Sequence, residues 1–303
     1  MRHIPVLLSE TIEGLDLHEG DIVVDCTLGD AGHAEQIMEL IAPTGKLIGI
    51  DADAEALLRA KQFLYRFGEH ATFVKDNFSN LSSITHAEGV HGKVHAILAD
   101  LGWSTPQFAE RGRGFSFHNE DELLDMRYGS GAIAPAHELL DEMSESQLTE
   151  IFQEYADESL ASNIAYAIVQ HRKKAHIRTV GDLVEIVLQT YREKLGTEKR
   201  VPWVGGNHPA TKVFQALRIA VNDEYGVIKS FIPEAIEALA PGGILAIITF
   251  HSGEDRIVKH MFKKAASLGQ IQLVQRKPIV CSEEEAKENP PSRSAKLRLV
   301  KKI

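Results

Sequence analysis

Residues 94–107 read VHAILADLGWSTPQ, and this stretch decides the fold class. An apolar, β-prone run from Val94 to Leu98 ends in an acid, Asp100, which a glycine, two hydroxyls, a proline and an amide soon follow. Open α/β sheets bind their ligands at the carboxyl ends of the strands, where such polar groups gather. The stretch therefore predicts a buried parallel strand that presents Asp100 and its successors to a ligand.

Strands and helices are expected to alternate on both sides of this run. Before it, the pattern predicts strands at 21–26, 46–50 and 71–74, with helices at 33–41, at 54–67 and near 81. After a break it resumes with helices at 209–221, 225–239 and 255–268, a turn at 241–243, and strands at 244–250, 271–274 and 295–300. Such alternation implies parallel βαβ units and hence an α/β fold.

The break between the two halves predicts an inserted domain. Residues 108–135 resemble a long loop, and residues 137–140, 145–155, 160–171 and 180–191 have helical patterns. Long loops in compact domains are often functional. We expect the main domain to comprise residues 1–135 and 205–303, with an inserted helical domain for substrate recognition at 136–204.

Composition restricts the function classes. Apolar residues make up 44% of the 303 and charged residues 25%, which is ordinary for a soluble protein with a substantial core. No apolar run approaches a membrane span, and Cys26 and Cys281 have no metal-ligand spacing, so we expect a cytoplasmic protein with no metal site. The net charge of −10 argues mildly against nucleic acid, although residues 287–303 hold six bases and one acid and leave a local basic surface open.

The loop after the first expected strand, DCTLGDAGH at 25–33, has the character of a cofactor loop. Its glycines allow a tight turn and the close approach of a ligand, and Asp51 ends the next strand where an acid can accept hydrogen bonds from a ribose diol. The loop lacks the full pattern of dinucleotide binders, which weakens a hydride-transfer hypothesis. An adenosine-type ligand is favoured over a purely structural turn, and Asp51 or Asp53 could instead cap the following helix.

Long motifs throughout the chain together resemble one known family. They are HIPVLL at 3–8, TLGDAGH at 27–33, ID at 50–51, NFSNL at 77–81, DLGWSTPQ at 100–107, ERGRGFSF at 110–117, LDMR at 124–127, HPAT at 208–211, FQALRI at 214–219, VNDE at 221–224, FHS at 250–252, EDRIVK at 254–259 and SRSAKLR at 292–298. On these motifs the chain resembles the S-adenosylmethionine-dependent methyltransferases that modify N4 of a cytidine in small-subunit (16S) ribosomal RNA near the decoding centre.

The resemblance implies a fold, a cofactor and partners. The fold is a Rossmann-like methyltransferase sheet with an inserted helical subdomain. Asp51 would hold the ribose hydroxyls and Phe78 would lie near the adenine. The residues implied to bind S-adenosylmethionine are Ala31, Gly32, His33, Asp51, Phe78, Asp100 and Gln107. The implied partner is small-subunit ribosomal RNA, within an assembled or nearly assembled particle, bound by a monomer or homodimer and without a membrane.

For methyl transfer, the catalytic candidates are Asp100, Ser104 and His251. An exocyclic cytosine amine is a poor nucleophile, so the enzyme must align it and accept hydrogen bonds from its protons. The base must be unpaired or extruded, and Trp103, Phe115 or Phe117 could stack on it. His251 could equally belong to a turn at the end of its strand.

Departures from the family pattern keep other functions open. Ala31 stands where the family usually has glycine, and we expect cofactor binding to tolerate it if its φ is negative. Trp103 and Gly253 replace a small aliphatic residue and a leucine. The alternatives are the same fold and cofactor acting on DNA, another RNA or an amine, and a non-catalytic ribosome-assembly module.

Overall fold

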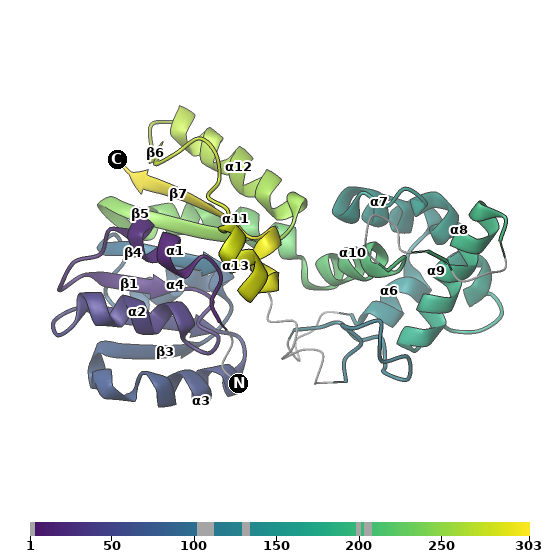
Figure 1. The fold of residues 1–303 in the computed structure, drawn as a ribbon, viewed down its shortest axis with the longest axis horizontal. Coiled ribbons are helices and arrows are strands. Elements are labelled where there is room, and N and C mark those ends of the chain that lie inside the picture. The colour runs from purple at the N-terminus through teal and green to yellow at the C-terminus, as the bar shows by residue number, and fades with distance from the viewer. Residues whose placement is uncertain (1–3, 102–111, 129–133, 198–200, 203–207) are drawn as a thin grey trace. The chain divides into compact units, whose positions relative to one another are not determined.

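The computed structural model describes residues 4–101, 112–128, 134–197, 201–202 and 208–303, and it contains two compact units (Figure 1). The first unit comprises Met1–Trp103 and Tyr225–Ile303, and the second comprises Ser104–Glu224. The predicted insertion at 136–204 lies within the second unit, which extends further in both directions along the chain. The domain boundaries drawn from the sequence stay a prediction.

A seven-stranded sheet organises the first unit, in the order β3-β2-β1-β4-β5-β7-β6. Its strands are β1 (Ile22–Asp25), β2 (Lys46–Asp51), β3 (Ala71–Lys75), β4 (Val94–Asp100), β5 (Leu239–Thr249), β6 (Ile271–Leu273) and β7 (Lys296–Lys302). All neighbours are parallel except that β7 pairs antiparallel with β5 and β6. The expected α/β class is thus confirmed, and strand order reverses between β1 and β4, where such sheets bind ligands.

Helices cover both faces of this sheet and bury two separate apolar clusters. Side chains of successive strand residues point to opposite faces, so Val23 packs into one cluster and Val24 into the other. The Val23 cluster includes residues of α1 (Leu8–Leu15), α2 (Gly32–Ile41) and α3 (Ala54–Phe63). The Val24 cluster includes residues of α4 (Leu81–Ala87), α11 (Glu224–Ala238) and α12 (Ser252–Ser267). This two-sided burial explains why the central strands are continuously apolar.

Local differences from the expected pattern have identifiable causes. The helix expected at 54–67 ends at Phe63, and a 3₁₀ segment follows at Tyr65–His70 with Gly68 at φ +55°. The turn expected at 241–243 falls inside β5, as a register shift against β4 with Gly242 at φ +82°. Two helices, α1 and α13 (Glu283–Glu288), were not predicted.

The second unit is helical in its described part. It contains α6 (Ala136–Glu142), α7 (Glu145–Ala156), α8 (Ala161–Arg172), α9 (Val180–Leu195) and α10 (Thr211–Asn222), which share an apolar cluster of their own. Capping boxes at Ser144 and Thr179 begin α7 and α9, and Gly196 ends α9 in the left-handed conformation.

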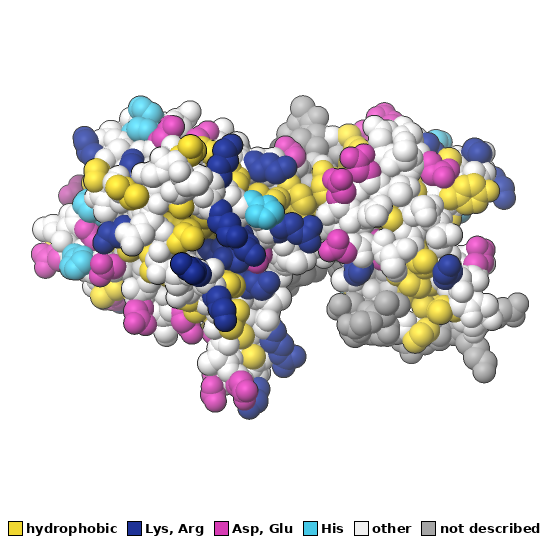
Figure 2. All heavy atoms as spheres, turned by 90° about the horizontal axis from the view of Figure 1, so that it is seen from above, with side chains coloured by type: hydrophobic (Ala, Val, Ile, Leu, Met, Phe, Trp, Pro, Cys, Tyr) yellow, Lys and Arg dark blue, Asp and Glu magenta, His cyan; other side chains and the backbone are white. Residues whose placement is uncertain are grey.

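Charged side chains cover much of the surface that Figure 2 draws, with Lys and Arg gathered in places. Within the described ranges, every helix is too short or too polar for a bilayer crossing.

Candidate active site at the carboxyl edge of the sheet

The loop after β1 is attached by its backbone to both neighbouring strands. The Cys26 amide donates to the Leu98 carbonyl at 2.8 Å, and the Leu28 amide donates to the Ile50 carbonyl at 3.0 Å. Gly29 has φ +51° and Ala31 has φ +58°, so both are left-handed. The condition stated for Ala31, a negative φ, is therefore not met, because the turn into α2 places this residue in the left-handed conformation. That conformation costs an alanine about 1 kcal/mol.

Asp51, at the end of β2, supports this loop with both carboxylate oxygens. Oδ2 accepts the Gly29 amide at 2.8 Å, and Oδ1 accepts the Asp53 amide at 2.8 Å. The cap of α3 is instead Asp53, whose Oδ1 accepts the Glu55 amide at 3.0 Å. Burial raises the pKa of Asp51 against the two amide bonds, which lower it. Each carboxylate oxygen has a second lone pair, so Asp51 can still accept two hydroxyls.

Asp25 is a buried acid that the sequence reasoning did not single out. Asp25 is the last residue of β1. Its side chain is 2% exposed and accepts a hydrogen bond from the Thr27 amide at 3.1 Å. Its pKa is raised to about 7, chiefly by burial; the Thr27 bond opposes this rise, and the nearby Asp51 charge adds to it. Its position at the end of a strand, next to the glycine loop, was the available signal.

Asp100 is connected to the cofactor loop through Thr27. The Asp100 amide donates to Thr27 Oγ1 at 2.7 Å, so the end of β4 and the loop after β1 are held in register. Asp100 is half-buried at the carboxyl end of β4. The hydrogen bond brings the predicted acceptor side and the predicted cofactor side together, and Thr27 is a residue that the sequence reasoning missed.

Gly32 and His33 begin α2 and contact the N-terminal segment. A Cβ on Gly32 would lie 2.7 Å from Pro5 Cγ, so only glycine fits without displacing Pro5. The His33 ring is buried, and its Nε2 lies 3.0 Å from the Val6 carbonyl. Asn289 holds the same segment by donating to the Ile4 carbonyl at 3.1 Å. The HIPVLL motif thus packs on the first turn of α2.

Phe78 lies in the turn after β3, on the Val24 side of the sheet. It is 8% exposed and packs edge to face against Phe231, with ring centroids 5.1 Å apart. Asn77 caps this turn by accepting the Ser79 amide at 2.9 Å. The packing holds the ring in place beside the end of β3, the neighbour of β2.

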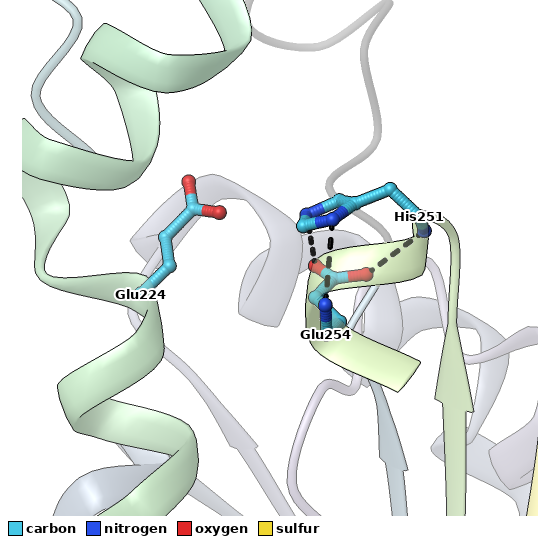
Figure 3. A group of neighbouring side chains, drawn as sticks. All are labelled: Glu224, His251 and Glu254. Atoms are coloured by element: carbon cyan, nitrogen blue, oxygen red, sulfur yellow. Dashed lines mark hydrogen bonds and ion pairs between the residues drawn. The ribbon is translucent and has the colours of Figure 1, made fainter. Parts of the chain in front are cut away.

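His251 follows β5 and begins α12, as its N-cap (Figure 3). Its Nδ1 accepts the Glu254 amide at 3.4 Å, and its Nε2 lies 3.2 Å from Glu254 Oε1. Glu254 in turn accepts the Phe250 amide at 2.8 Å and is 2% exposed. Both ring nitrogens therefore face the first turn of α12. Figure 3 also draws Glu224, whose carboxylate accepts from Arg218 at 2.8 Å.

Gly253, in the first turn of α12, leaves room for Tyr225. A Cβ at position 253 would lie 1.7 Å from the Tyr225 hydroxyl oxygen and 3.2 Å from His251 Nδ1. The Tyr225 and His251 rings lie 6.0 Å apart between centroids. Gly253, which departs from the family pattern, thus leaves the space that the Tyr225 side chain occupies beside His251.

Several predicted site residues lie outside the described ranges or in the second unit. Ser104 and Gln107 lie outside the described residues, as does Trp103. In the second unit, Phe115 stacks on Tyr128 with centroids 5.6 Å apart, and Phe117 stacks on His208 at 4.6 Å. One face of each phenylalanine ring is therefore covered.

The residues present fit S-adenosylmethionine. The loop after β1 has no side chain beyond Cα at Gly29 and Gly32 and only a buried methyl at Ala31, so backbone can approach a ligand closely. Asp51 keeps acceptor capacity for two ribose hydroxyls, and its carboxylate would supply negative charge to a cationic cofactor. Phe78 offers an apolar surface at the next strand.

Comparison with known proteins identifies the family. The sequence model of the MraW methylase family matches residues 1–303. The chain is 41% identical to the ribosomal RNA small subunit methyltransferase H of Paenibacillus sp. (strain JDR-2), over 100% of this chain and 99% of that protein. It is 42% identical to the protein of the same name from Symbiobacterium thermophilum, over 99% of this chain and 96% of that protein. A solved rRNA methylase from Streptococcus thermophilus aligns with TM-score 0.44 and 13% identity, over 100% and 99% of the two chains.

Proposed function

The chain belongs to the MraW methylase family, and from that premise we propose that it transfers a methyl group from S-adenosylmethionine to N4 of a cytidine in small-subunit ribosomal RNA near the decoding centre. The chain is an S-adenosylmethionine-dependent ribosomal RNA methyltransferase. The observation that carries the finer proposal is the bond from the Asp100 amide to Thr27 Oγ1, 2.7 Å long. It joins the strand end proposed to receive the acceptor to the loop proposed to hold the donor.

In this proposal the cofactor is held by Ala31, Gly32, His33, Asp51, Phe78, Asp100 and Gln107. Asp51 accepts the ribose hydroxyls, and Phe78 contacts the adenine. S-adenosylmethionine supplies an electrophilic methyl group when bound. Gly29 and Gly32 allow close backbone approach, and His33 keeps Val6 and the N-terminal segment against the first turn of α2.

Asp100 is the proposed hydrogen-bond acceptor for the cytidine amine. The N4 lone pair forms the bond to the methyl group as the methyl–sulfur bond breaks, and one N4 proton then leaves to the Asp100 carboxylate and on to water. A carboxylate at this position orients the amine and favours a more tetrahedral nitrogen. Ser104 is proposed to assist it. We assign His251 a positioning role, because both of its ring nitrogens face Glu254.

The cysteines support attack by nitrogen rather than methylation at a ring carbon. Carbon methylation of a pyrimidine needs a nucleophile such as a thiolate to add to the ring. Cys26 is 2% exposed, and burial raises its pKa well above the usual value, helped by the charge of Asp25. Cys281 packs against the Val23 cluster beside Ile279. The Cys26 thiol is therefore not placed as a reactive thiolate.

The partner proposed is the small-subunit particle, assembled or nearly so, acted on in the cytoplasm by a monomer or homodimer. The decisive assay incubates purified protein and labelled S-adenosylmethionine with small-subunit particles and with free ribosomal RNA, and identifies the modified nucleoside by mass spectrometry. N4-methylcytidine at one site is expected. Label in 5-methylcytidine, or in DNA, refutes the proposal.

Variants sharpen the assay. Asp100→Ala should abolish transfer, whereas Asp53→Asn should leave it near wild type because asparagine caps helices equally well. Activity of Asp100→Ala within a few-fold of wild type refutes the role of Asp100. A protein that binds no labelled cofactor favours the non-catalytic assembly module instead.

A further inference from the structure

The exposed face of α12 carries a row of Lys, Arg and His side chains, here called the α12 ridge: Arg256, Lys259, His260, Lys263 and Lys264. These positions follow i, i+3, i+4, i+7 and i+8, which places them within an arc of about 140° on the helix. The buried side chains of α12, such as Val258, Phe262 and Ala265, lie on the opposite arc. The ridge is therefore a consequence of the sequence spacing, and it extends about 12 Å along the helix.

No acid accompanies the α12 ridge on its face of the helix. The two acids of α12 are elsewhere: Glu254 is buried, and Asp255 is bonded to Arg298 at 2.6 Å. Lys259, Lys263 and Lys264 form no ion pair with any described residue. Some other cations of the first unit are paired, for example Lys46 with Glu88 and Arg59 with Asp30, both at 2.7 Å. In a protein with net charge −10, three lysines on one helix face with no acid of that helix beside them form a local basic surface.

The α12 ridge starts close to the candidate active site. His251 caps α12 at the carboxyl edge of the sheet, and Arg256 lies just over one turn further along. α12 packs against β6, and the exposed Arg276 and Lys277 follow that strand. Figure 2 looks onto the side of the first unit where Figure 1 places α12, and dark-blue side chains gather there.

We propose that the α12 ridge binds the phosphate backbone of the RNA strand whose cytidine enters the active site. The inference rests on the proposed function, because it names the surface that holds the same substrate. Lysine and arginine against phosphate fix position without reading sequence. The apolar side chains Ile257 and Met261 pack against the core, so the ridge offers no apolar face for insertion into a lipid surface.

The test compares two triple variants of the full chain that have the same net charge. One is Lys259→Gln/Lys263→Gln/Lys264→Gln. The control is Lys61→Gln/Lys75→Gln/Lys93→Gln, at exposed positions on α3, at the end of β3 and before β4. The probe is a fluorescent transcript of small-subunit ribosomal RNA, and Kd is measured by anisotropy over a range of salt concentrations.

The ridge variant should bind the transcript at least tenfold more weakly, and the slope of log Kd against log salt should fall by roughly 2, since three contacts contribute about 0.7 each. The control should keep the wild-type slope, and both variants should bind S-adenosylhomocysteine as wild type does. An unchanged salt slope in the ridge variant, or an equal loss of RNA affinity in the control, overturns the proposal. The proposal is also overturned if the ridge substitutions weaken binding to anionic phosphatidylserine vesicles but not to the transcript.

RNA binding is measured separately from methyl transfer, so the role of the α12 ridge and the proposed function can be refuted independently. A wild-type protein that binds the transcript through the ridge but yields no N4-methylcytidine refutes the proposed function alone. N4-methylcytidine formation with an unchanged salt slope in the ridge variant refutes the role of the ridge alone.

Discussion

Replacing Asp51 by asparagine tests whether this carboxylate holds the ribose. Both carboxylate oxygens already accept a backbone amide, from Gly29 and from Asp53, each at 2.8 Å. An asparagine side chain has only one acceptor oxygen, so in either orientation its NH₂ group meets one of these amides. The substitution therefore removes an acceptor from the loop and from the ligand at once, although its size is unchanged.

The magnitude differs between stability and cofactor binding. In the free protein the lost amide bond is offset, because burial raises the pKa of Asp51 and a neutral side chain avoids that desolvation. We expect the free energy of unfolding to change by about 1 kcal/mol or less. In the complex, one bond from a hydroxyl to a charged acceptor is lost, roughly 1.5–3 kcal/mol, which is about ten- to a hundredfold in Kd.

Isothermal titration calorimetry with S-adenosylhomocysteine measures this difference, and urea denaturation measures stability. Asp53→Asn is the matched control, because Asp53 caps α3 and asparagine is an equally good cap. A Kd for Asp51→Asn within twofold of wild type would show that Asp51 does not hold the ligand. A loss of several kcal/mol of stability would show that its role is structural.

Three other substitutions have expected outcomes. Asp25→Asn tests the pKa of about 7, which lies above the ordinary 3.8. The folded wild type keeps a proton that the unfolded chain releases, so wild-type stability should fall by roughly 4 kcal/mol relative to the variant as the pH rises from about 4 to 7. An equal pH dependence of the two proteins in urea denaturation across that range would contradict this. Gly32→Ala places a methyl 2.7 Å from Pro5 Cγ and should cost roughly 1–3 kcal/mol of stability, measured by urea denaturation. Cofactor binding should weaken as well. An unchanged denaturation midpoint would show that the N-terminal segment moves aside at no cost. Gly253→Ala forces the Tyr225 hydroxyl aside, and because that is the far end of a side chain, the melting temperature should change little. Since Tyr225 packs beside His251, kcat/KM for RNA should fall several-fold, and a rate equal to that of wild type would show that this packing does not support transfer.

Much of the fold was predictable because its signals are local. The apolar run at 94–98 and the glycine loop at 25–33 predicted strand ends that the structure confirms as β4 and β1. The helices α1 and α13 were missed, since their positions depend on long-range contacts. The Leu7 amide, just before α1, donates to Glu285 Oε1 at 2.8 Å, and 278 residues separate the two.

The candidate site was predictable in its residues but not in their connections. Asp51 and Asp100 could be identified because each ends an apolar strand, and parallel strands present their carboxyl ends at one edge. Thr27 could not, because its role depends on a hydroxyl that meets the Asp100 amide only when β1 and β4 pair. The orientation of His251 toward Glu254 and the left-handed Ala31 likewise depend on the folded backbone.

By itself, the sequence determined the fold class, the order of most strands and helices along the chain, the family and the strand-end acids Asp51 and Asp100, because periodicity, glycine placement and motif spacing are properties of the chain. Only the tertiary structure decided which acids accept which amides, that burial raises the pKa of Asp25, that Tyr225 fills the space above Gly253, and that the lysines of α12 form a row without acids. Those properties depend on distances between residues far apart in sequence, and such distances are set when the sheet and its helices pack.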